Sequence, residues 1–137
     1  ILIDEVVRTI HVPNHITLTV NNTLPKVFGN QYRFKQLFQN LIQNAIKYND
    51  KEAGTIEIGS TETQTELQFY IKDNGIGIAE KYQSKIFDVF SKLHNNDPSS
   101  GIGLSIVKKI IDIYNGKIWL ESLENSGTTF YFTLPKN

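Results

Sequence analysis

Two asparagines lie one helical turn apart in the stretch NLIQNAIKYN, residues 40–49. At about 100° per residue, Asn40, Asn44 and Lys47 fall within about 60° of one another, along one edge of a helix. A carboxamide oxygen is a hard ligand suited to Mg²⁺, and a lysine ammonium can neutralise a phosphate. This edge could hold a metal–phosphate group, and a solvated polar edge is the alternative interpretation.

A second candidate is the stretch DNGIGI, residues 73–78. Asp73 ends a predicted strand, and Gly75 and Gly77 allow the backbone to turn tightly and to approach a ligand closely. A carboxylate at this position can accept a hydrogen bond from an amine such as that of adenine. An ordinary Asn-Gly turn is the alternative here.

The third candidate is SSGIGLSI, residues 99–106, in which Gly101 and Gly103 precede a predicted helix. Backbone N–H groups and the helix dipole at such a start favour a phosphate. The stretch is not the dinucleotide fingerprint, because no strand directly precedes it and the third glycine is absent. It is not a Walker loop either, since that motif requires Gly-Lys-Ser/Thr.

The composition narrows the class of protein. The 137 residues suffice for one domain with a core, and 14 basic residues balance 14 acidic residues, so any anion site must be local. There is no cysteine for a disulfide or a thiolate, and no apolar run approaches the length of a membrane span. The chain lacks methionine and begins at Ile1, which favours a segment of a longer protein.

Hydrophobic periodicity predicts the elements that position these residues. The clearest is a helix over 31–48, whose apolar residues recur at three- and four-residue spacing. Further helices are predicted over 1–10, 80–90 and 103–114, and strands over 15–20, 55–60, 66–73, 117–122 and 127–135. Hairpin-linked strands with helices that share one face predict an α+β fold. We expect a two-layer sandwich of about three main helices on one face of a mixed, mostly antiparallel sheet of about five strands.

Together and in this order, the motifs resemble those of the ATP-binding catalytic domain of sensor histidine kinases. That family lies within the superfamily of gyrase-type, heat-shock-chaperone-type and mismatch-repair-type ATPases, which share the Bergerat fold. NLIQNAIKYN resembles the N-box, DNGIGI the first Gly box, IFDVFSK the F-box, and SSGIGLSIVKKII the second Gly box. The resemblance covers nearly the whole chain, which we interpret as a single domain over residues 1–137.

The resemblance implies roles for individual residues. Asn44 would bind the Mg²⁺ that bridges the ATP phosphates, and Asp73 would bind the adenine amine. Asn40 stands where hydrolysing relatives carry a glutamate that activates water, and an amide cannot act as that base, so transfer to a protein is favoured over hydrolysis. The implied catalytic residues are Asn40, Lys47 and Lys92. The implied nucleotide-binding residues are Asn44, Tyr48, Asp73, Gly75, Gly77, Ile78, Phe87, Phe90, Ser100, Gly101, Gly103 and Leu104.

The sequence departs from the family pattern in three places. Ser99 stands where the second Gly box usually begins with glycine, Val89 stands where the F-box often has proline, and the lid over 91–100 is short. Ser99 leaves open a degenerate module that binds nucleotide weakly or not at all and acts through protein contacts. A stand-alone Ser/Thr kinase of the anti-sigma type is the other alternative.

The resemblance also implies partners. A histidine on an upstream dimerisation hairpin would accept the phosphate, and the receiver domain of a response regulator would be the partner of the parent kinase. His11 and His15 are not followed by the acidic residue and downstream proline of that acceptor motif, and His94 lies in the predicted lid. We therefore interpret all three as structural or exposed. We expect a cytoplasmic domain, monomeric by itself, in a homodimeric parent that a membrane anchor could hold. Contact with nucleic acid or membrane is not expected.

Overall fold

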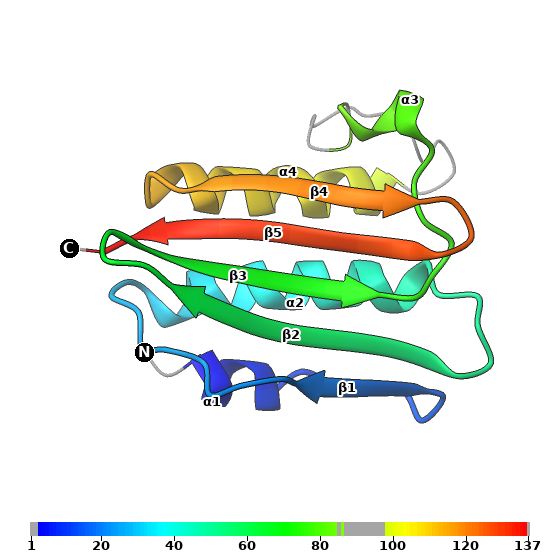
Figure 1. The fold of residues 1–137 in the computed structure, drawn as a ribbon, viewed down its shortest axis with the longest axis horizontal. Coiled ribbons are helices and arrows are strands. Elements are labelled where there is room, and N and C mark those ends of the chain that lie inside the picture. The colour runs from blue at the N-terminus through cyan, green and yellow to red at the C-terminus, as the bar shows by residue number, and fades with distance from the viewer. Residues whose placement is uncertain (1–2, 85, 87–97, 137) are drawn as a thin grey trace.

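The computed structural model describes residues 3–84, 86 and 98–136 (Figure 1). The helices are α1 (Ile3–Arg8), α2 (Gln31–Lys47), α3 (Glu80–Gln83) and α4 (Pro98–Ile113). The strands are β1 (Ile16–Val20), β2 (Gly54–Glu62), β3 (Glu66–Asp73), β4 (Lys117–Leu123) and β5 (Gly127–Pro135). No helix within these described ranges is long and apolar enough to cross a membrane.

The strands form one five-stranded sheet in the order β1-β2-β3-β5-β4. β1 pairs with β2 in parallel, and the other three pairings are antiparallel. The hairpins β2–β3 and β4–β5 join through β3 and β5, with Ile71 opposite Phe130. α2 and α4 lie against the same face of the sheet (Figure 1). The predicted α+β sandwich with a mixed sheet is therefore confirmed.

An aromatic cluster attaches α2 to the middle of the sheet. The ring of Phe38 meets Phe69 of β3 and Phe132 of β5 edge-on, with centroids 5.8 and 5.6 Å apart. Phe69 and Phe132 stack on each other at 5.0 Å, and all three side chains are fully buried. Edge-to-face and offset stacked pairs of this kind contribute about 1 kcal/mol each beyond the burial of area. The cluster sets the rotation of α2, and with it the direction in which the helix edge of Asn40 and Asn44 points.

The start of α2 follows from its cap. Asn30 has an extended backbone, and its Oδ1 accepts hydrogen bonds from the N–H groups of Tyr32 at 2.8 Å and Arg33 at 3.4 Å. An asparagine side chain in this position satisfies N–H groups that have no partner within the helix. The helix therefore begins at Gln31, as predicted, and it ends at Lys47, one residue before the predicted end.

The start of α4 differs from the prediction. The helix begins at Pro98 and not at Gly103, so the second Gly box lies within its first turns. Proline is well suited to the first helical position, because its φ is already helical and its missing N–H has no partner there. The helix ends in a left-handed cap: Asn115 has φ of 60°, and the N–H of Gly116 donates to the carbonyl of Ile111 at 2.9 Å. Of the helix predicted over 80–90, α3 covers Glu80–Gln83, and residues 85 and 87–90 lie outside the described part of the chain.

Candidate functional site

The polar edge of α2 faces the beginning of α4. Asn40 is half-buried, and its Nδ2 donates to the backbone carbonyl of Gly103 at 3.4 Å. Asn44, one turn further on, is also half-buried. Lys47 is exposed, with its Nζ 5.7 Å from the centre of the Tyr48 ring. Because the opposite face of α2 is packed on the sheet, these polar groups gather at the end of the helix nearest the start of α4.

The loop that follows β3 is fastened to the end of α2 and to the β4–β5 hairpin. The N–H of Ile76 donates to the carbonyl of Tyr48 at 3.0 Å, and its own carbonyl accepts from Asn125 at 2.7 Å. Gly77 has φ of +73°, and a Cβ atom there would lie 2.2 Å from the carbonyl oxygen of Leu123. Only glycine fits such a position, so the loop has one path between the two neighbouring elements.

Asp73 is the last residue of β3, and one of its two carboxylate oxygens accepts hydrogen bonds within the protein while the other is available to a ligand. Its Oδ1 accepts hydrogen bonds from the N–H groups of Gly75 at 2.8 Å and Thr128 at 3.2 Å. Its Oδ2 accepts none from the residues that the structure describes. Burial raises the pKa of Asp73 above its usual value, and the two N–H groups oppose that rise. A carboxylate oxygen is thus left for the donor group of a ligand.

Most of the predicted nucleotide-binding residues that the structure describes line one pocket. It lies where the ends of β3 and α2 meet the first turns of α4. The lining residues are Asn44, Tyr48, Asp73, Ile76, Gly77, Ile78, Leu104 and Thr128. Ile76 and Thr128 were not predicted from the sequence. The signal for Thr128 is the closing strand GTTF, because antiparallel pairing with β3 places the start of β5 beside Asp73.

The other predicted residues lie around this pocket or outside the described part of the chain. Asn40 and Lys47 flank it along α2, and Gly75 lies in the turn behind it. Ser100, Gly101 and Gly103 belong to the first turns of α4. Phe87, Phe90 and Lys92 lie outside the described residues, as does His94. The exposed His11 and His15 do not line the pocket.

No metal-binding cluster of acidic, histidine or cysteine side chains exists among the residues described. Mg²⁺ usually keeps several waters and binds through one or two protein oxygens together with the phosphates of a substrate. Asn44 is the side chain in the pocket wall that suits that role.

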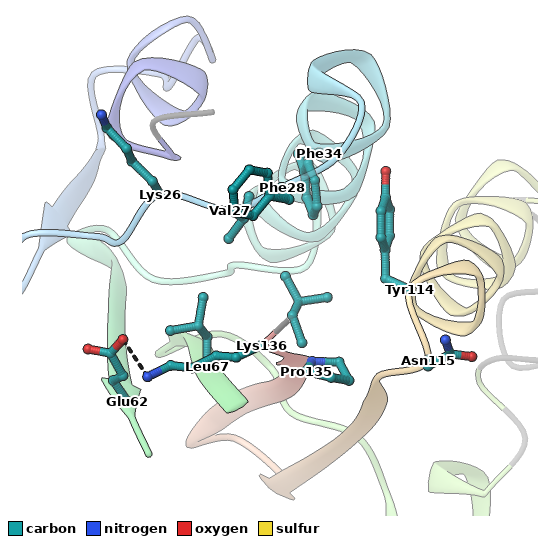
Figure 2. A pocket seen from close by; sticks show the side chains of 11 residues that line it. Lys26, Val27, Phe28, Phe34, Glu62, Leu67, Tyr114, Asn115, Pro135 and Lys136 are labelled. Atoms are coloured by element: carbon teal, nitrogen blue, oxygen red, sulfur yellow. Dashed lines mark ion pairs between the residues drawn. The ribbon is translucent and has the colours of Figure 1, made fainter. Parts of the chain in front are cut away.

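A second cavity, of about 430 Å³, lies near the opposite ends of α2 and α4 (Figure 2). Figure 2 shows Val27, Phe28 and Phe34 on one side of it and Leu67 and Pro135 on the other. None of the residues predicted to bind nucleotide lines this cavity. Since α2 is about 25 Å long, the cavity is remote from the pocket of Asp73. Its size alone does not make it the nucleotide site.

Comparison with known proteins shows the family to which the chain belongs. The family model of histidine kinase-, DNA gyrase B- and HSP90-like ATPases matches residues 29–137. Cyanobacterial phytochrome A of Nostoc sp. (strain PCC 7120) is 45% identical over 117 residues, which cover 84% of this chain and 15% of that protein. The adaptive-response sensory kinase SasA of Synechocystis sp. (strain PCC 6803) is 37% identical over 123 residues, covering 88% of this chain and 32% of that kinase.

The solved catalytic domain of the histidine kinase ThkA has the same fold. It is 35% identical, covers 98% of this chain and 90% of that domain, and gives a TM-score of 0.74. The fold is thus that of the catalytic domain of histidine kinases. The chain belongs to the family of histidine kinase-, DNA gyrase B- and HSP90-like ATPases. It spans only 15% to 16% of the length of the two phytochromes of Nostoc that it matches.

Proposed function

We propose that this domain binds Mg-ATP and presents the terminal phosphate to a histidine on a dimerisation hairpin of the same sensor kinase. The observation that carries the proposal is the single pocket shared by Asn44 and Asp73, which come from different elements. One end of the pocket offers a carboxylate oxygen to an amine. The other end combines the carboxamide of Asn44 with Leu104, in the second turn of α4, an arrangement that suits a metal and phosphates.

The wall of the pocket supports an orientation for the nucleotide. Asp73 Oδ2 is the acceptor for the adenine amine, and Ile76 and Ile78 supply apolar surface beside it. Leu104 lies in α4, so the phosphates extend toward the positive end of that helix. The exposed Lys47 lies at the same end of α2 as Asn44, where a cation offsets phosphate charge.

Asn40 bears on the choice between transfer and hydrolysis. Its carboxamide cannot take a proton from an attacking water, and its Nδ2 is directed to the carbonyl of Gly103. Bound Mg²⁺ would supply charge neutralisation at the phosphates. The contribution of the protein is then positioning: Asn44 for the metal, Asp73 for the base, and α4 for the phosphates. This supports phosphoryl transfer to an imidazole over transfer to water.

The binding step is tested by calorimetric titration of the 137-residue chain with a non-hydrolysable ATP analogue, with and without Mg²⁺. We expect saturable binding that Mg²⁺ strengthens. Asn44→Ala should remove the gain in affinity that Mg²⁺ gives, so that the affinity for the analogue in the presence of Mg²⁺ falls by about tenfold or more. Gln43→Ala is the matched control, because it removes an exposed carboxamide from the next position of the same helix. An unchanged magnesium effect in Asn44→Ala would refute the role of Asn44.

The transfer step is tested by supplying a separate dimerisation hairpin together with radiolabelled ATP. An acid-labile, base-stable label on the hairpin is the expected product of transfer to histidine. An acid-stable label on serine or threonine would indicate the anti-sigma type of kinase, and absence of binding in the folded chain would indicate a degenerate module. The proposal extends to a response regulator as the final acceptor and to a homodimeric parent, the arrangement expected for two-component sensor kinases.

A further inference from the structure

The hydroxyl group of Ser122 is the centre of a small hydrogen-bond network at the edge of the nucleotide pocket. Ser122 lies on β4, directly opposite Thr128 on β5. Its Oγ accepts from the N–H of Ile78 at 2.7 Å and lies 3.1 Å from the carbonyl oxygen of Gly127. Thr128 Oγ1 lies 2.8 Å away. One side chain therefore connects both strands of the hairpin with the loop that follows β3.

Counting protons decides which way these hydroxyl groups point. Ser122 has a single O–H, and a carbonyl oxygen such as that of Gly127 can only accept. The contacts to Gly127 and Thr128 are both hydrogen bonds only if Ser122 donates to the carbonyl and Thr128 donates to Ser122. In the opposite arrangement Ser122 would donate to Thr128, and the contact to Gly127 would have no proton. The network is complete only with Thr128 as a donor.

This direction determines what Thr128 offers to a ligand. Thr128 is 6% exposed, lines the nucleotide pocket, and donates its backbone N–H to Asp73 Oδ1 at 3.2 Å. Since its hydroxyl proton is directed to Ser122, only lone pairs of Oγ1 remain. The carboxylate of Asp73 beside it also only accepts. This corner of the pocket consequently presents acceptors from two adjacent side chains and no donor from either.

We propose that Ser122 is a positioning residue that makes the pocket select a base with an exocyclic amine over a base with a carbonyl at the same position. It acts through Thr128, by keeping the hydroxyl proton of Thr128 out of the pocket. Adenine places an amine at this corner, whereas hypoxanthine places a carbonyl oxygen against two acceptors. The inference rests on the proposed nucleotide function and deepens it, because it names the group that selects the base.

The experiment compares Mg-ADP with Mg-IDP by calorimetric titration of the complete 137-residue chain. Their bases differ in the group at C6, an amine or a carbonyl, and in the proton that hypoxanthine carries on the adjacent N1. The quantity measured is the ratio of the two dissociation constants. The wild type should bind ADP about tenfold or more tightly than IDP, because the carbonyl of IDP would leave acceptors unpaired. In Ser122→Ala the hydroxyl of Thr128 is free to turn toward the carbonyl, and the preference should fall several-fold.

Two further variants distinguish a role of Ser122 in selecting ADP over IDP from a role in supporting the loop that follows β3. Thr128→Val, which keeps the shape and removes the hydroxyl, should lower the same ratio, and adding Ser122→Ala to it should lower the ratio no further. Ser122→Thr, which keeps a hydroxyl, should retain the preference. Equal weakening of ADP and IDP by Ser122→Ala, with the ratio unchanged, would overturn the inference and leave Ser122 as a support for Ile78.

The variants can be judged only when folded, so each is first checked by thermal unfolding. If Ser122→Ala does not fold, the ratio in Thr128→Val decides: a retained preference for ADP overturns the inference. A wild type that binds ADP and IDP equally also overturns it. A folded wild type that binds neither nucleotide would instead refute the proposed function, which distinguishes that failure from the failure of this inference.

Discussion

The α-carbon of Gly75 packs against the backbone carbonyl oxygen of Tyr48, so closely that a Cβ atom at Gly75 would lie 2.5 Å from that oxygen. The neighbouring N–H of Ile76 donates to the same carbonyl at 3.0 Å. Close approach and hydrogen bond together fix the loop after β3 to the end of α2. They set the spacing between the carboxylate of Asp73 and the polar edge of the helix.

Gly75→Ala should therefore both destabilise the fold and weaken nucleotide binding. The clash is with a backbone atom, which cannot swing aside, so the free energy of unfolding should fall by about 1–3 kcal/mol. Urea unfolding, followed by the fluorescence of Trp119, measures this loss. Gly103→Ala is the matched control, because among the side chains that the structure describes a Cβ there would meet only that of Asn40, with Cγ 4.0 Å away. Because alanine favours a helix over glycine by up to about 1 kcal/mol, Gly103→Ala should be no less stable than the wild type.

Asp73→Asn should separate binding from stability. The amide oxygen can still accept from Gly75 and Thr128, while the cost of burying a charge disappears. Its NH₂ group replaces the free carboxylate oxygen and places a donor against the adenine amine. We expect nucleotide affinity to fall by about tenfold or more, with a melting temperature equal to or above that of the wild type. A large drop in melting temperature would contradict this account of the site.

The raised pKa of Asp73 also predicts how stability depends on pH. Because its pKa in the folded state lies above its ordinary value of 3.8, the folded protein holds this proton more tightly than the unfolded chain. The contribution of Asp73 is then greatest below 3.8 and is lost as pH rises through the raised pKa. Asn does not titrate. The stability of the wild type relative to Asp73→Asn should therefore decrease as pH rises through this window, and then level off.

Denaturant unfolding of both proteins at a series of pH values measures this difference directly. Other carboxyl groups titrate in both proteins, so their effects cancel in the comparison. A difference that increases with pH would mean that the two N–H groups dominate over burial at Asp73. Asp73 Oδ2 would then not be a poorly solvated oxygen that lacks a hydrogen-bond donor.

The cap of α2 gives a prediction at the end of the helix remote from the pocket. Asn30→Ala removes the acceptor for the N–H groups of Tyr32 and Arg33, so unfolding free energy should fall by about 1 kcal/mol. Asn30→Asp keeps an acceptor and should retain most of the unfolding free energy that Asn30→Ala loses. Nucleotide affinity in the folded protein should be unchanged in both variants. A loss of affinity matching the loss of stability would indicate that the whole helix shifts.

The sequence by itself determined much of this protein. Alternating residues located β3 and β5 at the bounds that the structure has, and apolar residues at three- and four-residue spacing located α2. Asp73 and Asn44 could be selected because their motifs are local: each needs only a few neighbouring residues of the right type. These features depend on periodicity, capping and turn chemistry, which act within about a dozen residues.

Only the tertiary structure decided which distant residues complete the site. The start of α4 at Pro98, the place of Ile76 in the pocket wall, and the network of Ser122 and Thr128 were not apparent from the sequence. Thr128 meets Asp73 across 55 positions of chain. No local pattern encodes such a contact, because it arises when strand pairing brings the β4–β5 hairpin against the end of β3. The selectivity that we propose for the base depends on hydroxyl directions that exist only after this pairing has formed.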